Sequence, residues 1–163
     1  MRRLILMRHA KSSWDSPTLS DHERALNSRG QRSARALGDW LRAQDHVPDQ
    51  ALVSSARRTQ ETMAGLRLGL TPDLLPQLYH ASDGQMLDAL RAARGDRVLM
   101  IGHNPGIADF AATLVARAPD HPRFHDYPTC ATLVVAFDVP DWSCAAPGGG
   151  QVIDFVIPRD LSA

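Results

Sequence analysis

Short apolar runs alternate with amphipathic segments along most of the chain, and this alternation constrains the fold more than any other feature. The runs Leu4–Met7, Ala51–Val53 and Val98–Ile101 contain only apolar residues, as expected of strands buried on both faces of a sheet. Segments with helical spacing of apolar residues separate these runs. Parallel strands need such crossovers, so the alternation predicts an α/β fold, a three-layer α/β/α sandwich with a mostly parallel sheet.

The predicted helices begin at recognisable start signals. Ser82 and Gln85 have the spacing of a capping box, and Ser28 and Gln31 have the same spacing. Pro105 suits the first turn of a helix, where its missing N–H is not needed. The predicted helices cover residues 28–43, residues 56–68, the segment between Ser82 and Gly95, and a segment that begins near Pro105.

The C-terminal part of the chain departs from this alternation. Ala131–Phe137 and Val152–Ile157 are strand-like runs that are separated by a glycine-rich loop and not by a helix. Two successive strands of this kind predict an antiparallel pair, so we expect an antiparallel edge strand at one end of the sheet. Since no repeat or linker divides the 163 residues, a single domain over residues 1–163 is expected.

Composition argues against several classes of protein. Lys plus Arg and Asp plus Glu number 18 each, so no global charge would attract nucleic acid or an anionic membrane. The N-terminal apolar run is too short for a signal peptide, and no stretch could span a bilayer, which favours a cytoplasmic protein. Cys130 and Cys144 do not have the spacing of a zinc site. Neither a metal nor a cofactor is predicted.

Histidine and arginine residues follow three of the predicted strands at the point where each strand ends. Arg8 and His9 come directly after the first strand. Arg58 comes shortly after the second strand, and His103 follows the strand at Val98–Ile101. Ligands of open α/β sheets bind at the carboxyl ends of the strands, so these side chains are expected to converge there. A lone histidine or arginine is usually a surface residue, but placement at three strand ends favours a site.

These residue types suit phosphoryl transfer. Arginine donates paired hydrogen bonds to phosphate oxygens and stays charged at physiological pH. A neutral imidazole can attack phosphorus and become phosphohistidine. A second histidine, if protonated, would stabilise the negative charge that spreads over the transferred group. Since the reaction depends mainly on positioning and charge stabilisation, this set could perform it without a metal.

The same residues resemble the motifs of a known family. Leu-Met-Arg-His-Ala at 6–10 is similar to the opening motif of the histidine phosphatase (phosphoglycerate mutase-like) superfamily. Ser54-x-x-x-Arg58-x-x-x-Thr62 resembles the second motif, and Gly102-His103-Asn104-Pro105-Gly106 resembles the third. The resemblance implies that His9 is the nucleophile, that Arg8 and Arg58 bind phosphate, and that His103 is the second histidine of the pocket.

Within the superfamily, the chain is similar to the small bacterial phosphohistidine phosphatases of the SixA type. The similarity lies in the alanine after the first histidine, the Lys-Ser-Ser-Trp that follows, and Asp21-x-x-Arg24-x-Leu26-x-x-Arg29-Gly30. The hydroxyl of Ser12 is a candidate hydrogen-bond donor to the phosphate, although small polar loop residues also cap their own backbone. Arg24 either reaches the substrate phosphate or pairs with Asp21 to close the first loop. The proline-rich segment 119–128 is expected to be a loop that lines the pocket mouth.

Many superfamily members use a carboxylic acid to protonate the leaving group, and the chain has Gln77 at the expected position. An amide cannot donate a proton in catalysis. An alkoxide leaves poorly without an acid, whereas free imidazole has a pKa of about 6.5 and needs little help. The substitution therefore favours phosphohistidine on a signalling protein as the substrate, with His80 and Asp83 as alternative donors.

Two alternatives remain at this point. One is a small-molecule phosphomonoesterase of the same superfamily, and the other is a non-catalytic module that binds phosphate. A metal hydrolase that uses the seven histidines has little support, because their spacing does not match a metal site. The sequence predicts a phosphorylated protein or small molecule as the partner, but it does not identify this partner or the oligomeric state.

Overall fold

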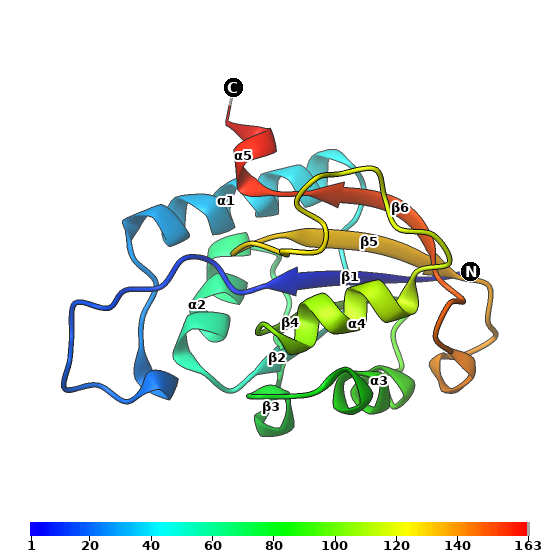
Figure 1. Cartoon of the computed structure of the whole chain (residues 1–163), viewed down its shortest axis with the longest axis horizontal. Helices are drawn as coiled ribbons and strands as arrows, with labels where there is room; N and C mark the ends of the chain where they lie inside the picture. The colour runs from blue at the N-terminus through cyan, green and yellow to red at the C-terminus, as the bar shows by residue number, and fades with distance from the viewer. Residues whose placement is uncertain (163) are drawn as a thin grey trace.

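The computed structural model describes residues 1–162, which form a six-stranded sheet with helices on both faces (Figure 1). The order of the strands in the sheet is β3-β2-β4-β1-β5-β6. The strands are β1 (Arg2–Arg8), β2 (Gln50–Ser54), β3 (Asp73–Leu75), β4 (Arg97–Gly102), β5 (Thr132–Phe137) and β6 (Gln151–Val156). Strands β1 to β4 pair in parallel, and β5 pairs antiparallel with both of its neighbours. The predicted mostly parallel sheet with an antiparallel edge pair is confirmed.

Two helices cover each face of the sheet. The helices are α1 (Ser28–Ala43), α2 (Arg57–Leu66), α3 (Asp83–Arg91), α4 (Gly106–Leu114) and the short C-terminal α5 (Pro158–Leu161). Apolar residues of α1 and α2 share one buried cluster, whereas those of α3 and α4 belong to the other cluster. The structure therefore has the three predicted layers.

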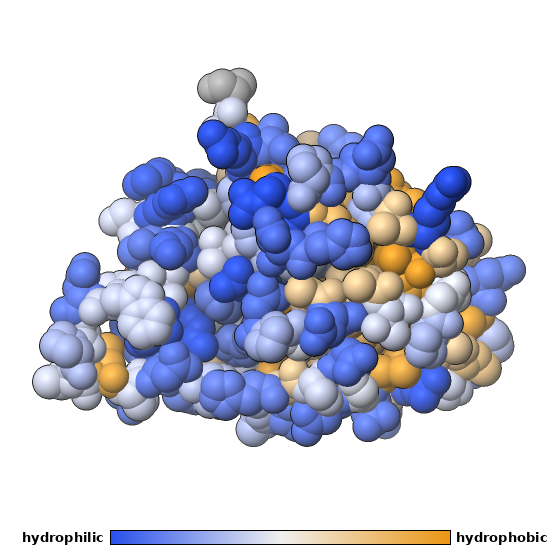
Figure 2. Space-filling model, in the orientation of Figure 1, coloured by the Kyte–Doolittle hydropathy of each residue, from blue (hydrophilic) through white to orange (hydrophobic). Residues whose placement is uncertain are grey.

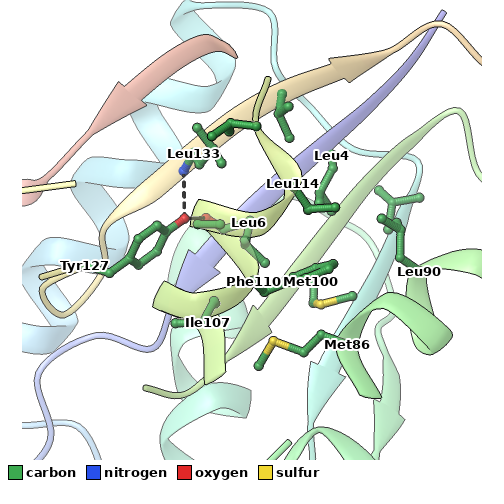
Figure 3. Close-up of a cluster of buried hydrophobic side chains, with 14 of the residues drawn as sticks. Leu4, Leu6, Met86, Leu90, Met100, Ile107, Phe110, Leu114, Tyr127 and Leu133 are labelled. Carbon is green, nitrogen blue, oxygen red and sulfur yellow. Dashed lines mark hydrogen bonds between the residues drawn. The ribbon is translucent and has the colours of Figure 1, made fainter. Parts of the chain in front are cut away.

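Strand β1 lies inside the sheet and contributes to both cores. Leu4 and Leu6 face the cluster under α3 and α4, whereas Ile5 and Met7 face the cluster under α1 and α2. All four are fully buried, as the apolar run predicted. Figure 3 shows Leu4 and Leu6 packed with residues of α3 and α4. A parallel strand between two helical layers needs apolar residues on both faces, and this is the reason for the uninterrupted run.

Tyr127 joins the loop before β5 to the centre of the sheet. Its hydroxyl donates to the backbone oxygen of Leu6 and accepts from the backbone N–H of Leu133 at 3.2 Å (Figure 3). The side chain is fully buried. A buried hydroxyl with both roles satisfied holds the loop in one place, next to the carboxyl end of β1.

The start signals of two helices have different outcomes. The capping box of Ser82 and Gln85 is present with both hydrogen bonds, at 3.2 and 2.8 Å. The box predicted at Ser28 and Gln31 is wrong, because Asn27 is the N-cap of α1 and its side chain accepts from the N–H of Gly30 at 2.8 Å. Strand β3 and helix α5 lack a clear sequence signal, because 3 and 4 residues are too few for a repeating apolar pattern to be recognised.

No helix among residues 1–162 has both the length and the apolar character needed to cross a membrane.

Candidate active site

A pocket of about 220 Å³ lies at the carboxyl ends of β1 and β4, where the sequence predicted a site. In Figure 1 this edge is the left side, toward which the arrow of β1 points. The loop after β1, the start of α2 and the loop before β5 close the pocket. Its lining residues are Arg8, His9, Lys11, Ser12, Trp14, Arg24, Arg58, His103, Asn104 and Thr129. All six predicted site residues therefore lie in one pocket.

His9 is held in the orientation that a nucleophile needs. Its backbone N–H donates to the oxygen of Gly102 at 3.1 Å, which fixes it beside the end of β4. Its Nδ1 lies 2.7 Å from the backbone oxygen of Ala10, and only a protonated Nδ1 can donate to that oxygen. The proton of the neutral ring therefore sits on Nδ1, and the lone pair of Nε2 is free to attack an electrophile.

Burial keeps His9 neutral. The side chain is 7% exposed, and burial lowers its pKa to about 3, assisted by the positive charges of Arg8, Arg58 and Arg24. The hydrogen bond to Ala10 opposes this shift only in part. At physiological pH the ring is neutral and its Nε2 is unprotonated, as nucleophilic attack requires.

His103 is neutral in the same pocket. Its Nε2 lies 2.8 Å from Ser54 Oγ, and its Nδ1 lies 3.3 Å from Nη2 of Arg58. A guanidinium can only donate, so Nδ1 accepts and Nε2 carries the proton. Burial lowers the pKa of His103 to about 3, and His9 and Arg58 contribute. The protonated second histidine considered from the sequence is therefore not the form in the unliganded pocket; a bound phosphate dianion would raise this pKa.

Arg58 and not the adjacent Arg57 enters the pocket. Arg58 is 6% exposed, and its Nη2 pairs with Asp21 Oδ2 at 3.0 Å. Arg57 is exposed and pairs with Glu61 at 3.2 Å, one helical turn further along α2. Successive residues of a helix point about 100° apart, so only one of the two can face the strand ends.

Asp21 is the common partner of the arginines. Its Oδ1 pairs with Arg24 at 2.7 Å, and its Oδ2 accepts from the hydroxyl of Tyr79 at 2.6 Å as well as from Arg58. The hydrogen bond from Tyr79, together with those from Arg24 and Arg58, holds the pKa of this carboxyl well below its usual range. Asp21 is thus ionised and positions the guanidinium groups of both arginines.

Arg24 meets both of the sequence-based alternatives, since it pairs with Asp21 and also lines the pocket. Its Nη2 donates to Ser12 Oγ, so the hydroxyl of Ser12 is held against a cation within the pocket. The guanidinium carbon of Arg24 lies 3.3 Å from the ring centroid of Trp14, which is 72% exposed. The ring of Trp14 therefore covers Arg24 at the pocket mouth.

Arg8 has a buried hydrogen-bond donor, its Nε, that has no acceptor among residues 1–162. Its Nη1 donates to the backbone oxygen of Tyr127 at 3.2 Å. Burial and the charge of Arg58 lower its pKa. Arg24 and Arg58 share the carboxylate of Asp21, whereas Arg8 has no ion pair with residues 1–162, and Lys11 adds a further positive charge at the rim. The pocket is built to receive an anion.

The residues considered as proton donors lie outside the pocket. Gln77 and His80 are exposed, and Asp83 is the first residue of α3.

The sequence reasoning missed Tyr79, Asn104 and Thr129. Asn104 Nδ2 donates to the backbone oxygen of Tyr127 at 3.1 Å. The expectation that segment 119–128 lines the pocket is wrong: none of its residues is among the lining residues, and Thr129, just beyond it, is. Within the segment, the backbone oxygen of Tyr127 accepts from Arg8, and His121 pairs with Asp160 of α5 at 3.0 Å.

Lowering the pH from neutrality is expected to destabilise the fold through His9 and His103. Both have a pKa of about 3 when folded, against an ordinary value of 6.5. Between these values the unfolded chain binds more protons than the folded chain. The free energy of unfolding therefore decreases as the pH is lowered, by up to about 1.4 kcal/mol per pH unit for each histidine. Urea unfolding across this range measures the slope. His9→Asn, whose amide can still donate to Ala10, should give a shallower slope; an identical slope would contradict the burial of a neutral His9.

Among residues 1–162, no three side chains of the histidine, cysteine, aspartate or glutamate type are grouped so that they could hold a metal ion. The observed donor set instead consists of guanidinium, ammonium, amide and hydroxyl groups around His9. These groups suit oxyanions.

Comparisons with known proteins agree with this geometry. The profile of the histidine phosphatase superfamily (branch 1) matches residues 4–86. An uncharacterized protein of Mycobacterium tuberculosis is 30% identical over 94% of this chain and its own full length. The phosphohistidine phosphatase SixA of Escherichia coli is 28% identical over 69% of this chain and 73% of that protein. A structure of the protein histidine phosphatase SixA with tungstate is 25% identical, with a TM-score of 0.79 over 98% of this chain and 99% of that one. The chain belongs to the histidine phosphatase superfamily.

Proposed function

We propose that this phosphatase hydrolyses phosphohistidine on a protein, through a covalent phosphohistidine intermediate at His9 and without a metal. The observation that carries the proposal is the free Nε2 of His9 in a pocket lined by three arginines, of which only Arg24 and Arg58 pair with a carboxylate, that of Asp21. Tungstate is an oxyanion, and its presence in a SixA protein supports an oxyanion site of this kind. SixA of Escherichia coli, whose name gives phosphohistidine as its substrate, supports the choice of phosphoryl donor.

The proposed first step transfers the phosphoryl group to His9. Nε2 of His9 forms a bond to phosphorus while the bond between phosphorus and the substrate ring breaks. The substrate ring carries a proton from solvent on its other nitrogen and therefore leaves as neutral imidazole. Arg8, Arg58 and Ser12 bind the peripheral oxygens as charge redistributes over them. In the second step, water attacks phosphorus, inorganic phosphate leaves, and the neutral ring of His9 is restored.

The absence of a suitable acid supports an imidazole leaving group. No carboxyl group lines the pocket among the described residues, and Asp21 behind it is held ionised by Tyr79, Arg24 and Arg58. An alkoxide leaving group would have to depart without a proton, whereas imidazole is a much weaker base. The pocket is therefore better matched to phosphoramidates than to alkyl phosphates.

The test is a substrate panel run on the wild-type protein. We expect a phosphohistidine peptide and phosphoramidate to be hydrolysed with kcat/KM at least about tenfold above that of a sugar phosphate. A tenfold ratio corresponds to a difference of about 1.4 kcal/mol between the activation free energies for the two kinds of leaving group. Faster hydrolysis of the sugar phosphate would reject the proposal in favour of a small-molecule phosphomonoesterase. Tight binding of phosphate with no turnover of any substrate would indicate a binding module. Loss of activity with a chelator would indicate a metal hydrolase.

A further inference from the structure

A second cleft, of about 590 Å³, lies between α1 and α5 and is lined by three arginines, Arg29, Arg32 and Arg159. Pro158 and Leu161 supply apolar parts of its wall. The cleft is larger than the pocket around His9 and shares no lining residue with it. Figure 2 shows that the surface below the C-terminus, where α5 approaches α1, is strongly hydrophilic. The proposed reaction assigns no role to this cleft.

The three arginines have no partner that explains their presence. None of them forms an ion pair or a side-chain hydrogen bond with residues 1–162, whereas Arg42, further along α1, pairs with Asp39 at 2.7 Å. The nearest carboxylate on α5, that of Asp160, is already bound to His121 at 3.0 Å. Among residues 1–162, no carboxylate therefore forms an ion pair with an arginine of this cleft.

The arrangement of these charges is unfavourable for the helix that carries them. The first turn of α1 contains Arg29 and no acidic residue. The first ten residues of this helix contain no carboxylate, and their arginines are Arg29, Arg32 and Arg35. The amino end of a helix carries partial positive charge, so cations placed there lower the stability of the helix. A binding role explains why the sequence places arginines there.

The cleft and the catalytic pocket open at the same edge of the sheet. Thr132 of β5 is paired with Met7 on one side and with Val156 on the other, so β6 ends level with β1, and α5 follows directly. Gly30 of α1 packs so closely on the loop after His9 that a Cβ would lie 2.1 Å from the oxygen of Lys11. Lys11 lines the catalytic pocket and is exposed, and it lies against the first turn of α1, which carries Arg29 of the cleft.

We propose that this arginine-lined cleft binds acidic side chains that flank the phosphohistidine of the protein substrate. The inference rests on the proposed function, because it needs a substrate that extends beyond the phosphoryl group. A small phosphate ester that fills the pocket would not reach a separate cleft. The chain as a whole has no net charge, so this local surface favours a partner with a complementary acidic patch.

The test uses two phosphohistidine peptides, one flanked by glutamates and the other by glutamines. For the wild type, we expect kcat/KM to be about tenfold higher on the glutamate peptide at low ionic strength, with the advantage lost as salt is added. The variant Arg29→Glu/Arg32→Glu should lose this preference and keep its activity on the glutamine peptide and on phosphoramidate. Its Tm should be unchanged or higher, because glutamates suit the first turn of α1.

Arg35→Glu is the matched control, since Arg35 is an exposed arginine of the same helix that lies in a different groove. It should keep the preference for the glutamate peptide. Equal hydrolysis of both peptides by the wild type, or an equal loss on all substrates in the double variant, would overturn the inference. Binding of the unphosphorylated peptides is measured in parallel. If neither phosphopeptide is hydrolysed but the glutamate peptide still binds through Arg29 and Arg32, the proposed reaction fails and the acidic docking surface stands.

Discussion

His9→Ala is expected to lower kcat/KM for phosphohistidine by about 10³-fold or more, because the variant removes the atom that accepts the phosphoryl group. The loss should appear in kcat, since Arg8, Arg58 and Ser12 still bind the phosphate oxygens. Brief exposure of the wild type to a labelled phosphoryl donor should give an acid-labile, base-stable adduct at His9. The variant should give none.

His125→Ala is the control for this experiment. His125 is an exposed histidine of the loop before β5 and does not line the pocket. Its removal should leave turnover and labelling unchanged. Residual activity of the His9 variant near the wild-type level, or an adduct that persists without His9, would show that another group is the nucleophile. The buried thiol of Cys130 is a poor substitute, because burial raises its pKa to about 12.

Arg58→Ala is expected to reduce kcat/KM by about 10²- to 10³-fold, similar to the loss of one donor from a site that stabilises developing charge. The variant removes a phosphate ligand and also the donor to Nδ1 of His103 at 3.3 Å. Arg57→Ala provides the comparison, because its side chain is exposed and points away from the pocket toward Glu61. We expect Arg57→Ala to change kcat/KM by less than about twofold, as is usual for exposed ion pairs.

Steady-state kinetics of the two variants, with thermal unfolding as a check on folding, decides the comparison. Arg58→Lys should recover only part of the activity, because an ammonium group lacks the planar pair of donors. Equal effects of Arg57→Ala and Arg58→Ala would contradict the placement of Arg58 in the pocket. A large effect that appears only in Tm would assign Arg58 to structure instead.

Much of the site could be predicted because it follows from local sequence and one topological rule. The apolar runs located β1, β2 and β4, and the rule that ligands bind at the carboxyl ends of parallel strands brought Arg8, Arg58 and His103 together. The choice between Arg57 and Arg58 rested on motif spacing. The structure gives the physical reason, which is that the two side chains point in different directions from α2.

The parts that could not be predicted depend on contacts between distant segments. Asp21 and Tyr79 are 58 residues apart in the chain, and nothing in either local sequence indicates their hydrogen bond. Likewise, nothing in the local sequence indicates that the ring of Trp14 covers the guanidinium of Arg24 at the surface. Asn27 and Ser28 are both good capping residues, and only the backbone conformation decides which one caps α1.

The interior position of β1 has a consequence for synthesis of the protein. This strand is synthesised before both of its partners, because it pairs Arg3 with Arg97 of β4 and Arg2 with Phe137 of β5. Both partner strands are synthesised later. Until then β1 is an unpaired apolar segment, which makes the nascent chain prone to aggregation. The backbone oxygen of His9 accepts from the N–H of Cys130 at 3.0 Å, and Thr129 lines the pocket, so the site is complete only after the segment before β5 has been synthesised. A chain that ends before this segment is expected to be inactive and prone to capture by chaperones.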